Sequence, residues 1–278
     1  MQTAAKVDQI TEQRIWRFHG EERYPENDQI TVEEPLEIRL NGESVAVVMR
    51  TPKNDFELAA GFVYTEGVVE QATDIGTVSY CPQADPPNLQ NVVDVRLSQG
   101  VAFDSSKLKR NFYASSSCGV CGKASIDSIR THAPLLKADF QIGVENLYGL
   151  QDVFRDSQKV FEQTGSLHGA ALFDPQGELL TVREDVGRHN AVDKLVGAYI
   201  LESRLPPEDV LLMVSGRTSF EIVQKALMAG IAAVAGVSAP SSLAIQMAEE
   251  AGMTLIGFLR GSGFNLYTGP QRVSTKGI

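Results

Sequence analysis

The sequence has few cysteines, no long apolar run and no evident targeting segment. Its three cysteines, Cys81, Cys118 and Cys121, are an odd number, which does not suit a disulfide framework. The longest apolar run, residues 226–237, is shorter than the roughly 18 residues needed to cross a bilayer. The N-terminus lacks a basic segment followed by an apolar one, so no signal peptide is expected. We therefore predict a cytoplasmic protein without a membrane-spanning helix.

Two further absences concern ligands. Neither GxGxxG nor GxxxxGK[ST] occurs, so the sequence does not support a Rossmann or Walker nucleotide site. The formal net charge of −10 argues against nucleic-acid binding by the molecule as a whole, because a surface rich in Lys and Arg is needed to neutralise the phosphates. The composition is that of a folded protein, with 43% hydrophobic and 22% charged residues. A length of 278 residues suits one or two domains.

The first part of the chain predicts a small α+β domain, residues 1–112. Two alternating apolar runs flank Asn41-Gly42, a dipeptide that suits a tight hairpin turn. Asn54 then precedes apolar residues at helical spacing, with Glu57 in the position of a capping box. Two more strand-like runs, IGTVSY and NVVDVRL, complete the predicted order β-β-α-β-β.

Residues 113–130 are predicted to form a mobile loop that joins two domains. The segment SSSCGVCGKAS has no apolar periodicity and is rich in Ser and Gly. The window 101–130 carries a net charge of about +3 within an acidic protein. We therefore expect the loop to attract anions.

The rest of the chain, residues 131–278, predicts an α/β domain. A helix over residues 145–164 precedes the strand-like runs LHGAALF and ELLTVR, which a DPQG turn joins into a predicted hairpin. A helix over residues 189–201 follows them. The runs VLLMVS, AAVAGVS and TLIGFL come next, the first two followed by helices over residues 219–229 and 241–251. Short, continuous apolar strands that alternate with helices indicate a parallel sheet covered on both faces.

The CxxC pair of Cys118 and Cys121 is the most suggestive chemical feature. Two thiols at this spacing can bind a metal, cycle as a disulfide or pass sulfur between them. A structural zinc site needs further ligands, and only Cys81 and four scattered histidines remain. Zinc binding, redox shuttling and incidental loop cysteines all stay open here. The nearby cations favour sulfur chemistry because they stabilise a thiolate and its persulfide. Cys81 is interpreted as a half-buried strand cysteine.

Three successive strand-to-helix turns carry small hydroxyl residues and arginines. Each turn can simply cap its helix, but together they line the carboxyl edge of one sheet, where N–H groups and helix dipoles receive anions. We therefore expect a phosphate-bearing ligand at this edge. The candidates in the turns are Arg188, His189, Ser215, Arg217, Ser219 and Ser241. A glycine-rich segment after the last strand supplies Phe258, Leu259, Arg260, Gly261, Ser262 and Gly263, unless it is only a flexible basic tail.

The motifs SCGVCGKAS, HGAALF, EDVGRHNAVDK, SGRTSFEIVQKA and TLIGFLRGSGFNLYTGPQR, taken in order, resemble the FdhD family of sulfur carriers needed to make active formate dehydrogenase. The resemblance spans about residues 30–275. It implies a three-layer α/β C-terminal domain like that of the cytidine deaminases, without their zinc ligands. A smaller α+β domain lies beside it at the N-terminus.

The resemblance also implies a function. Members of the FdhD family take persulfide sulfur from a cysteine desulfurase. They transfer it to molybdenum bis(molybdopterin guanine dinucleotide) before that cofactor enters the formate dehydrogenase apoenzyme. Cys118 matches the persulfide-bearing cysteine, Cys121 matches the second loop cysteine, and residues 258–263 match the cofactor-binding segment. Gly263 departs from the basic residue expected there in some relatives.

The implied partners are the desulfurase, the apoenzyme, the cofactor as bound cargo and a second copy in a homodimer. No permanently bound metal is implied. Two other functions stay open from the residues alone. One is a chaperone that delivers the cofactor without sulfur chemistry, and the other is a thiol-disulfide oxidoreductase that uses the CxxC pair.

Overall fold

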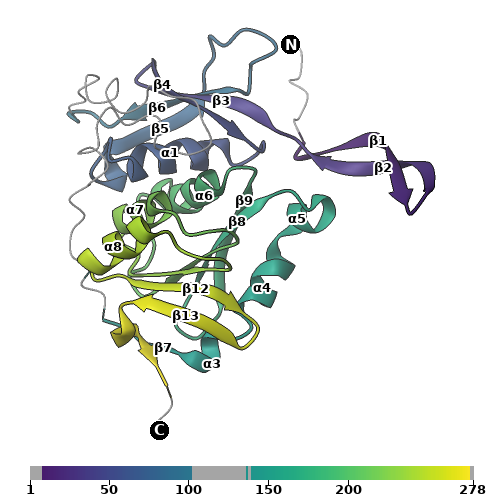
Figure 1. Cartoon of the computed structure of the whole chain (residues 1–278). Helices are drawn as coiled ribbons and strands as arrows, with labels where there is room; N and C mark the ends of the chain where they lie inside the picture. Colours follow the sequence, from purple (N-terminus) through teal and green to yellow (C-terminus); the bar gives the residue numbers. More distant parts are fainter. Residues whose placement is uncertain (1–7, 102–135, 137–138, 276–278) are drawn as a thin grey trace.

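The computed structural model describes residues 8–101, 136 and 139–275, which form two packed parts and a projecting arm (Figure 1). The strands are β1 (Ile10–His19), β2 (Glu22–Thr31), β3 (Glu34–Leu40), β4 (Glu43–Arg50), β5 (Ile75–Tyr80), β6 (Val92–Leu97), β7 (Ile142–Gly143), β8 (His168–Phe173), β9 (Leu179–Asp185), β10 (Leu211–Val214), β11 (Ala233–Gly236), β12 (Thr254–Arg260), β13 (Gly263–Thr268) and β14 (Val273–Ser274). The helices are α1 (Asp55–Thr65), α3 (Val144–Leu147), α4 (Leu150–Ser157), α5 (Lys159–Thr164), α6 (Arg188–Ile200), α7 (Phe220–Met228) and α8 (Ser242–Glu250), with short 3-10 turns η1 (Ala72–Asp74) and η4 (Pro270–Arg272). The predicted loop at residues 113–130 lies outside the described residues.

The N-terminal part is a four-stranded sheet in the order β4-β3-β6-β5, with α1 packed on one face. The predicted hairpin is confirmed, and both Asn41 and Gly42 have positive φ angles, 51° and 88°. The predicted capping box is wrong. Asn54 has a left-handed conformation and makes no side-chain cap, while Glu57 is paired with Arg183 instead.

The C-terminal part contains a six-stranded sheet in the order β13-β12-β11-β10-β8-β9. The predicted hairpin of β8 and β9 is confirmed. The prediction of a parallel sheet is only partly right, because β10, β11 and β12 are parallel whereas β8 and β13 run antiparallel to β10 and β12. Apolar runs do not reveal in which direction β8 pairs with β10, but the short β12–β13 connection permits only antiparallel pairing.

The helix predicted over residues 145–164 is instead the three short helices α3, α4 and α5. Gly149, with a φ of 84°, separates α3 from α4. Gln158, with a ψ of 80°, separates α4 from α5. Amphipathic spacing continues across both breaks, which explains why the sequence looks like one helix. Within the described part of the chain, no helix is both long and apolar enough to cross a membrane.

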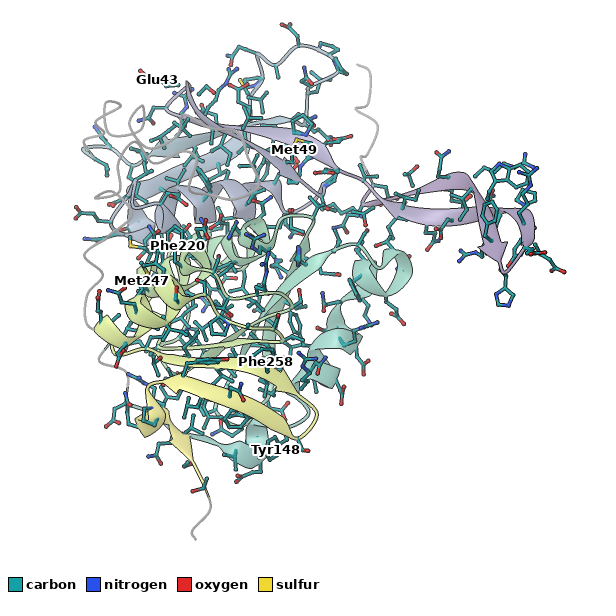
Figure 2. All side chains as sticks on the ribbon, in the orientation of Figure 1. Glu43, Met49, Tyr148, Phe220, Met247 and Phe258 are labelled. Carbon is teal, nitrogen blue, oxygen red and sulfur yellow. The ribbon has the colours of Figure 1, made fainter. Side chains whose placement is uncertain are left out.

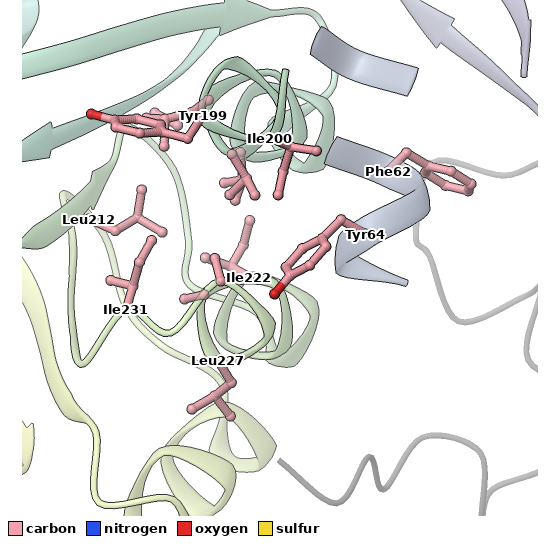
Figure 3. Close-up of a cluster of buried hydrophobic side chains, with 14 of the residues drawn as sticks. Phe62, Tyr64, Tyr199, Ile200, Leu212, Ile222, Leu227 and Ile231 are labelled. Atoms are coloured by element: carbon pink, nitrogen blue, oxygen red, sulfur yellow. The ribbon is translucent and has the colours of Figure 1, made fainter. Parts of the chain in front are cut away.

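Helices cover both faces of the six-stranded sheet, as predicted. The α6–α8 face carries the larger core, and α3 and α4 pack on the other face. The larger core also includes α1, whose Tyr64 points toward Ile222 of α7 (Figure 3). The two parts therefore share one hydrophobic core, which fixes the four-stranded sheet relative to the six-stranded one.

The arm is the β1–β2 hairpin, which the sequence reasoning did not predict. It forms a two-stranded sheet of its own and extends away from both parts (Figure 1). Its base is held by the Thr31 hydroxyl, which donates to Thr164 Oγ1 at 2.9 Å and lies 2.6 Å from Ser166 Oγ. Most of its side chains are exposed.

Candidate functional site

The predicted turns meet at one edge of the six-stranded sheet. The carboxyl ends of β10, β11 and β12 lie there, and β8 begins at the same edge because it runs antiparallel to β10. Backbone hydrogen bonds join the turns. Thr218 N donates to Ala239 O at 3.2 Å, Ser241 N donates to Thr218 O at 3.0 Å, and Phe258 N donates to Ser238 O at 3.2 Å. The edge is therefore a connected surface of backbone amides and small side chains.

Two histidines and an arginine gather where α7 begins. His189 Nε2 lies 3.3 Å from Ser219 Oγ and 3.5 Å from Glu221 Oε2. Burial lowers the pKa of His168, and the neighbouring charges of Arg188 and His189 lower that pKa further. Bringing a cation, two imidazoles and a hydroxyl to a helix N-terminus creates a place where an anion is stabilised.

Glu221 is the acidic member of this group. Burial alone would raise its pKa, but hydrogen bonds from His189 and Ser219 outweigh that effect and hold the pKa below its usual value. The carboxylate thus stays ionised next to His189 and offsets part of the positive charge. The Arg188 guanidinium, by contrast, has no hydrogen-bond partner in the described part of the chain and is half-buried.

Two of the predicted serines also have structural roles. Ser215 Oγ accepts a hydrogen bond from Gly169 N at 2.9 Å, which ties β10 to the start of β8. Ser241 Oγ accepts from Ala244 N at 3.3 Å and so caps α8. Arg217 is exposed at the same edge. Ser241 therefore caps its helix, as considered for these turns. It is also exposed at the edge where the ligand is expected.

The acidic residues that precede Arg188 hold the fold together. Glu184 accepts hydrogen bonds from Val160 N and Phe161 N at the start of α5. Asp185 is paired with Lys194 at 2.7 Å, and both side chains are fully buried. The ammonium of Lys194 also donates to the carbonyl of residue 51 at 2.8 Å, across the boundary between the two parts. Much of the EDVGRHNAVDK motif is thus structural.

A second buried cluster uses the end of the same motif. Lys225 Nζ of α7 lies 2.9 Å from Asp193 Oδ1 of α6 and 2.9 Å from Glu66 Oε1. Burial opposes the charge on Lys225, but these two carboxylates outweigh it and raise the pKa of Lys225 above its usual value. Thr65 donates to Asp193 at 2.7 Å, so α1, α6 and α7 are joined by one polar network.

The glycine-rich segment is a hairpin rather than a flexible tail. Its first three residues end β12, Gly261 and Ser262 form the turn, and Gly263 begins β13. Phe258 has a φ of 54°, which is rare for an aromatic residue and marks a local irregularity in the strand pair. The Arg260 guanidinium lies 5.6 Å from the centre of the ring of Phe258, which is labelled in Figure 2. Both residues belong to the end of β12, at the same edge of the sheet as the turns. Leu259 is only 1% exposed, and its side chain packs in the core.

The cysteines divide between described and undescribed residues. Cys118 and Cys121, the predicted catalytic pair, lie outside the described residues. Cys81 follows β5 and is buried, with its Sγ 3.6 Å from Arg39 Nη1 and donating to Gln83 Oε1 at 3.3 Å. These contacts match its interpretation as a strand cysteine. Among the residues that the structure describes, no group of three or more His, Cys, Asp or Glu side chains is placed to hold a metal ion.

Two residues at the edge were not predicted. His168 lies in the predicted strand run LHGAALF and Glu221 in the predicted helix over residues 219–229, and neither was among the predicted ligand residues. His168 begins a strand that runs antiparallel to β10, so it starts at the edge where the parallel strands end. That edge is where ligands bind in α/β folds, which is the signal that could have identified His168. The signal for Glu221 is its place two residues after Ser219, in the first turn of a helix.

Comparisons with known proteins agree on one family. A family model described as FdhD/NarQ matches residues 31–274. Proteins named "Sulfur carrier protein FdhD" are similar to this chain. One from Streptomyces coelicolor is 54% identical over 254 residues, covering 90% of both chains. One from Mycobacterium tuberculosis is 46% identical over 268 residues, covering 94% of this chain and 97% of the relative.

A solved structure is also similar. It is the crystal structure of a protein from Desulfotalea psychrophila, described as a formate dehydrogenase accessory protein. The TM-score is 0.76 at 24% sequence identity, and the match covers 96% of this chain and 100% of the other. This likeness shows the mixed α/β fold.

Proposed function

The chain belongs to the FdhD/NarQ family, and from that membership we propose that it is a sulfur carrier for formate dehydrogenase. It accepts sulfur from a cysteine desulfurase on Cys118 and delivers it to molybdenum bis(molybdopterin guanine dinucleotide). The cofactor is the cargo and later enters the formate dehydrogenase apoenzyme. The observation that carries the proposal is the family match over residues 31–274, which includes the CxxC pair.

The first proposed step is transpersulfidation. The Cys118 thiolate attacks the sulfane sulfur of the donor persulfide, a new sulfur–sulfur bond forms on Cys118, and the donor cysteine leaves as a thiolate. Atoms and electrons balance without an external oxidant. The basic residues around the CxxC pair support this step, because they favour both the attacking thiolate and the persulfide anion.

The second proposed step transfers the terminal sulfur to molybdenum. Sulfane sulfur must gain two electrons to leave as sulfide, and the Cys121 thiol supplies them. Cys121 attacks the inner sulfur of the Cys118 persulfide, a disulfide between the two cysteines forms, and sulfide is released to the metal. A cellular thiol reductant then restores the two thiols.

The cargo is proposed to lie across the carboxyl edge of the six-stranded sheet. Its phosphates would face the N-termini of α7 and α8 and the β12–β13 turn, with Arg188 and Arg260 nearby. The geometry supporting this placement is the joined pair of turns and the group formed by His168, His189 and Ser219. Phe258, beside Arg260, offers an aromatic surface at the same edge.

The proposed carrier works in the cytoplasm as a homodimer. A cytoplasmic location suits the chemistry, because thiols stay reduced there between transfers. Its protein partners are the cysteine desulfurase and the formate dehydrogenase apoenzyme.

Intact mass spectrometry tests the sulfur role. Wild type, Cys118→Ala and Cys121→Ala are incubated with a cysteine desulfurase and cysteine, and each mass is compared with its untreated form. We expect wild type and Cys121→Ala to gain sulfur and Cys118→Ala to gain none. Cys81→Ala is the matched control and should gain sulfur like wild type, because Cys81 is buried beside Arg39.

The same proteins distinguish the alternatives. If wild type gains no sulfur and Cys118→Ala still activates formate dehydrogenase, the protein delivers cofactor without sulfur chemistry. If both cysteine variants lose activity equally and no persulfide forms, the pair acts as a disulfide oxidoreductase. Either result contradicts the proposal.

A further inference from the structure

The arm has two different faces. In the register of β1 and β2, Trp16 lies opposite Pro25 and Phe18 lies opposite Arg23, which places all four side chains on one face. Trp16 is 61% exposed and Phe18 is 66% exposed. The Arg23 guanidinium lies 5.3 Å from the centre of the Trp16 ring. We call this surface, Trp16, Phe18, Arg23 and Pro25, the aromatic face.

The opposite face of the arm carries charge pairs. Arg17 forms an ion pair with Glu26 and lies 3.9 Å from Asp28, and Tyr24 is opposite Arg17. Exposed charge pairs of this kind are ordinary on a surface that faces water. The aromatic face differs, because exposed Trp, Phe and Arg side chains in one patch have the composition of a protein interface.

Among the described residues, the arm has little packing against the rest of the chain. Its larger contacts are those between β1 and β2 themselves and those of β2 with α5 near the base. A two-stranded hairpin without further packing is at most marginally stable in water. A partner that covers the aromatic face would supply the missing burial.

The size of the arm indicates what kind of partner covers it. A ten-residue antiparallel ribbon of two strands is about 33 Å long and about 10 Å wide, or roughly 330 Å² on one face. One arm that lies along its whole length on a partner therefore buries at most roughly 700 Å² in total, which is below the range of about 1,200–2,000 Å² for stable interfaces. Two such arms exchanged between two copies bury up to roughly 1,300 Å², which reaches that range. Area thus favours a reciprocal contact.

The chain also has a surface to receive an arm. Val47 and Met49 lie on the face of the four-stranded sheet away from α1, because Ala46 and Val48 between them pack against the core. Val47 is 53% exposed, and Met49, labelled in Figure 2, is 49% exposed. Pro35 of β3 is paired with Met49. We call Pro35, Val47 and Met49 the outer sheet face. A two-fold interface requires that each copy gives and receives the same contact. One arm and one outer sheet face per chain meet that requirement.

The aromatic face is basic, because it carries Arg23 and Arg14 lies on the same side of β1. A basic patch is attracted over a distance by a second copy whose net charge is −10.

We propose that the β1–β2 arm is an exchange element, whose aromatic face docks on the outer sheet face of a second copy of this chain. The inference rests on the homodimer included in the proposed function and assigns its interface. It is independent of the sulfur chemistry at Cys118.

Trp16 is the only tryptophan of the chain, so its fluorescence reports directly on the arm. We would record its emission over a dilution series of the whole protein and measure the mass at each concentration by sedimentation. The expected result is dimer mass with blue-shifted emission at high concentration. On dilution, emission and mass should shift together with one midpoint.

Two substitutions make a matched pair. Phe18→Glu puts a carboxylate opposite Arg23 on the aromatic face, and Tyr24→Glu puts one opposite Arg17 on the other face. Each variant puts one carboxylate across the ribbon from an arginine, so the two make the same change of charge on opposite faces. We expect Phe18→Glu to weaken dimerisation by roughly 30-fold or more, as for a central interface residue. Tyr24→Glu should leave it unchanged, and Met49→Glu should weaken it like Phe18→Glu.

Each other outcome overturns the inference. Dimer mass with exposed Trp16 emission at every concentration means that the copies meet elsewhere. An effect of Phe18→Glu without one of Met49→Glu removes the outer sheet face as the receiving surface. A blue shift only after addition of formate dehydrogenase apoenzyme makes that protein the occupant. Monomer mass throughout removes the homodimer as well, while sulfur loading of Cys118, measured separately, still decides the sulfur role.

Discussion

Gly61 of α1 and Gly197 of α6 lie against each other where the two helices cross. A Cβ on Gly197 would lie 2.8 Å from the backbone nitrogen of Gly61, and a Cβ on Gly61 would lie 2.9 Å from that of Gly197. Each added carbon would also overlap a carbonyl oxygen of the other helix, that of Asp193 or Glu57. The two parts of the molecule can therefore pack this closely only because both positions lack a side chain.

Replacing either glycine with alanine should destabilise the protein. Alanine favours a helix by up to about 1 kcal/mol over glycine. Overpacking against backbone typically costs about 1–3 kcal/mol and outweighs that gain. We expect Gly61→Ala and Gly197→Ala each to lower the free energy of unfolding by a net 1–2 kcal/mol or so, measured by urea denaturation. Gly263→Ala is the control, because a Cβ there has no heavy atom within 4 Å. Unchanged stability of Gly61→Ala would show that the helices separate without cost.

The buried pair of Asp185 and Lys194 should be costly to break from one side. Removing the ammonium leaves a buried carboxylate, for which a loss of about 3–5 kcal/mol is typical. We expect Lys194→Met to lower the free energy of unfolding by about 3–5 kcal/mol. The double variant Asp185→Asn/Lys194→Met should lose less free energy of unfolding than the sum of the losses in the two single variants. Lys159→Met is the matched control, since Lys159 is exposed. Additive effects in this double-mutant cycle would mean that the pair is not coupled.

The sequence could not show how these motif residues are used. EDVGRHNAVDK suggested a phosphate turn, and Arg188 and His189 do lie at the ligand edge. Some partners of its acidic residues are far away in the chain, as with Thr65, which hydrogen-bonds Asp193 across 128 positions. A single sequence contains no signal for such contacts, so their structural role appears only in three dimensions.

Local patterns predicted individual elements better than their arrangement. The Asn41-Gly42 turn requires positive φ angles and therefore identified its hairpin correctly. Strand β13 and the β1–β2 arm were both missed. Most of their residues are exposed or only partly buried, so their sequences show no buried face.

His168 should make the protein less stable as pH falls. Burial and the charges of Arg188 and His189 lower its pKa below the ordinary 6.5, so the unfolded chain binds this proton more readily. Stability from the neutral imidazole is complete above pH 6.5 and is lost as pH falls through the lower folded pKa. We expect His168→Gln to flatten the dependence of unfolding free energy on pH below 6.5. His19→Gln, at an exposed position, should keep the wild-type slope. Equal slopes for wild type and His168→Gln would contradict the assignment.

Arg188 should contribute strongly to binding of the cargo. Its guanidinium is near His168 at the ligand edge and has no hydrogen-bond partner in the described part of the chain. A hydrogen bond from a charged group is worth about 1.5–3 kcal/mol, so Arg188→Gln should weaken binding of guanosine diphosphate by roughly 10- to 150-fold. Isothermal titration calorimetry measures this loss. Arg204→Gln is the control, because Arg204 pairs with Glu202 at an exposed site.

Ser241 allows the proposed position of the phosphates to be tested with a change of charge alone. Its hydroxyl caps α8, and Asp and Asn cap helices about as well as Ser does. Ser241→Asp and Ser241→Asn should therefore fold alike and differ only by one negative charge. If phosphates lie at this helix N-terminus, a charge there changes the energy by about 0.3–1 kcal/mol, so Ser241→Asp should bind guanosine diphosphate roughly two- to fivefold more weakly than Ser241→Asn. The difference should shrink at high salt, because an exposed charge is screened. Equal affinity of the two variants at low salt would exclude the α8 terminus from the phosphate site, because neither the cap nor the fold distinguishes them.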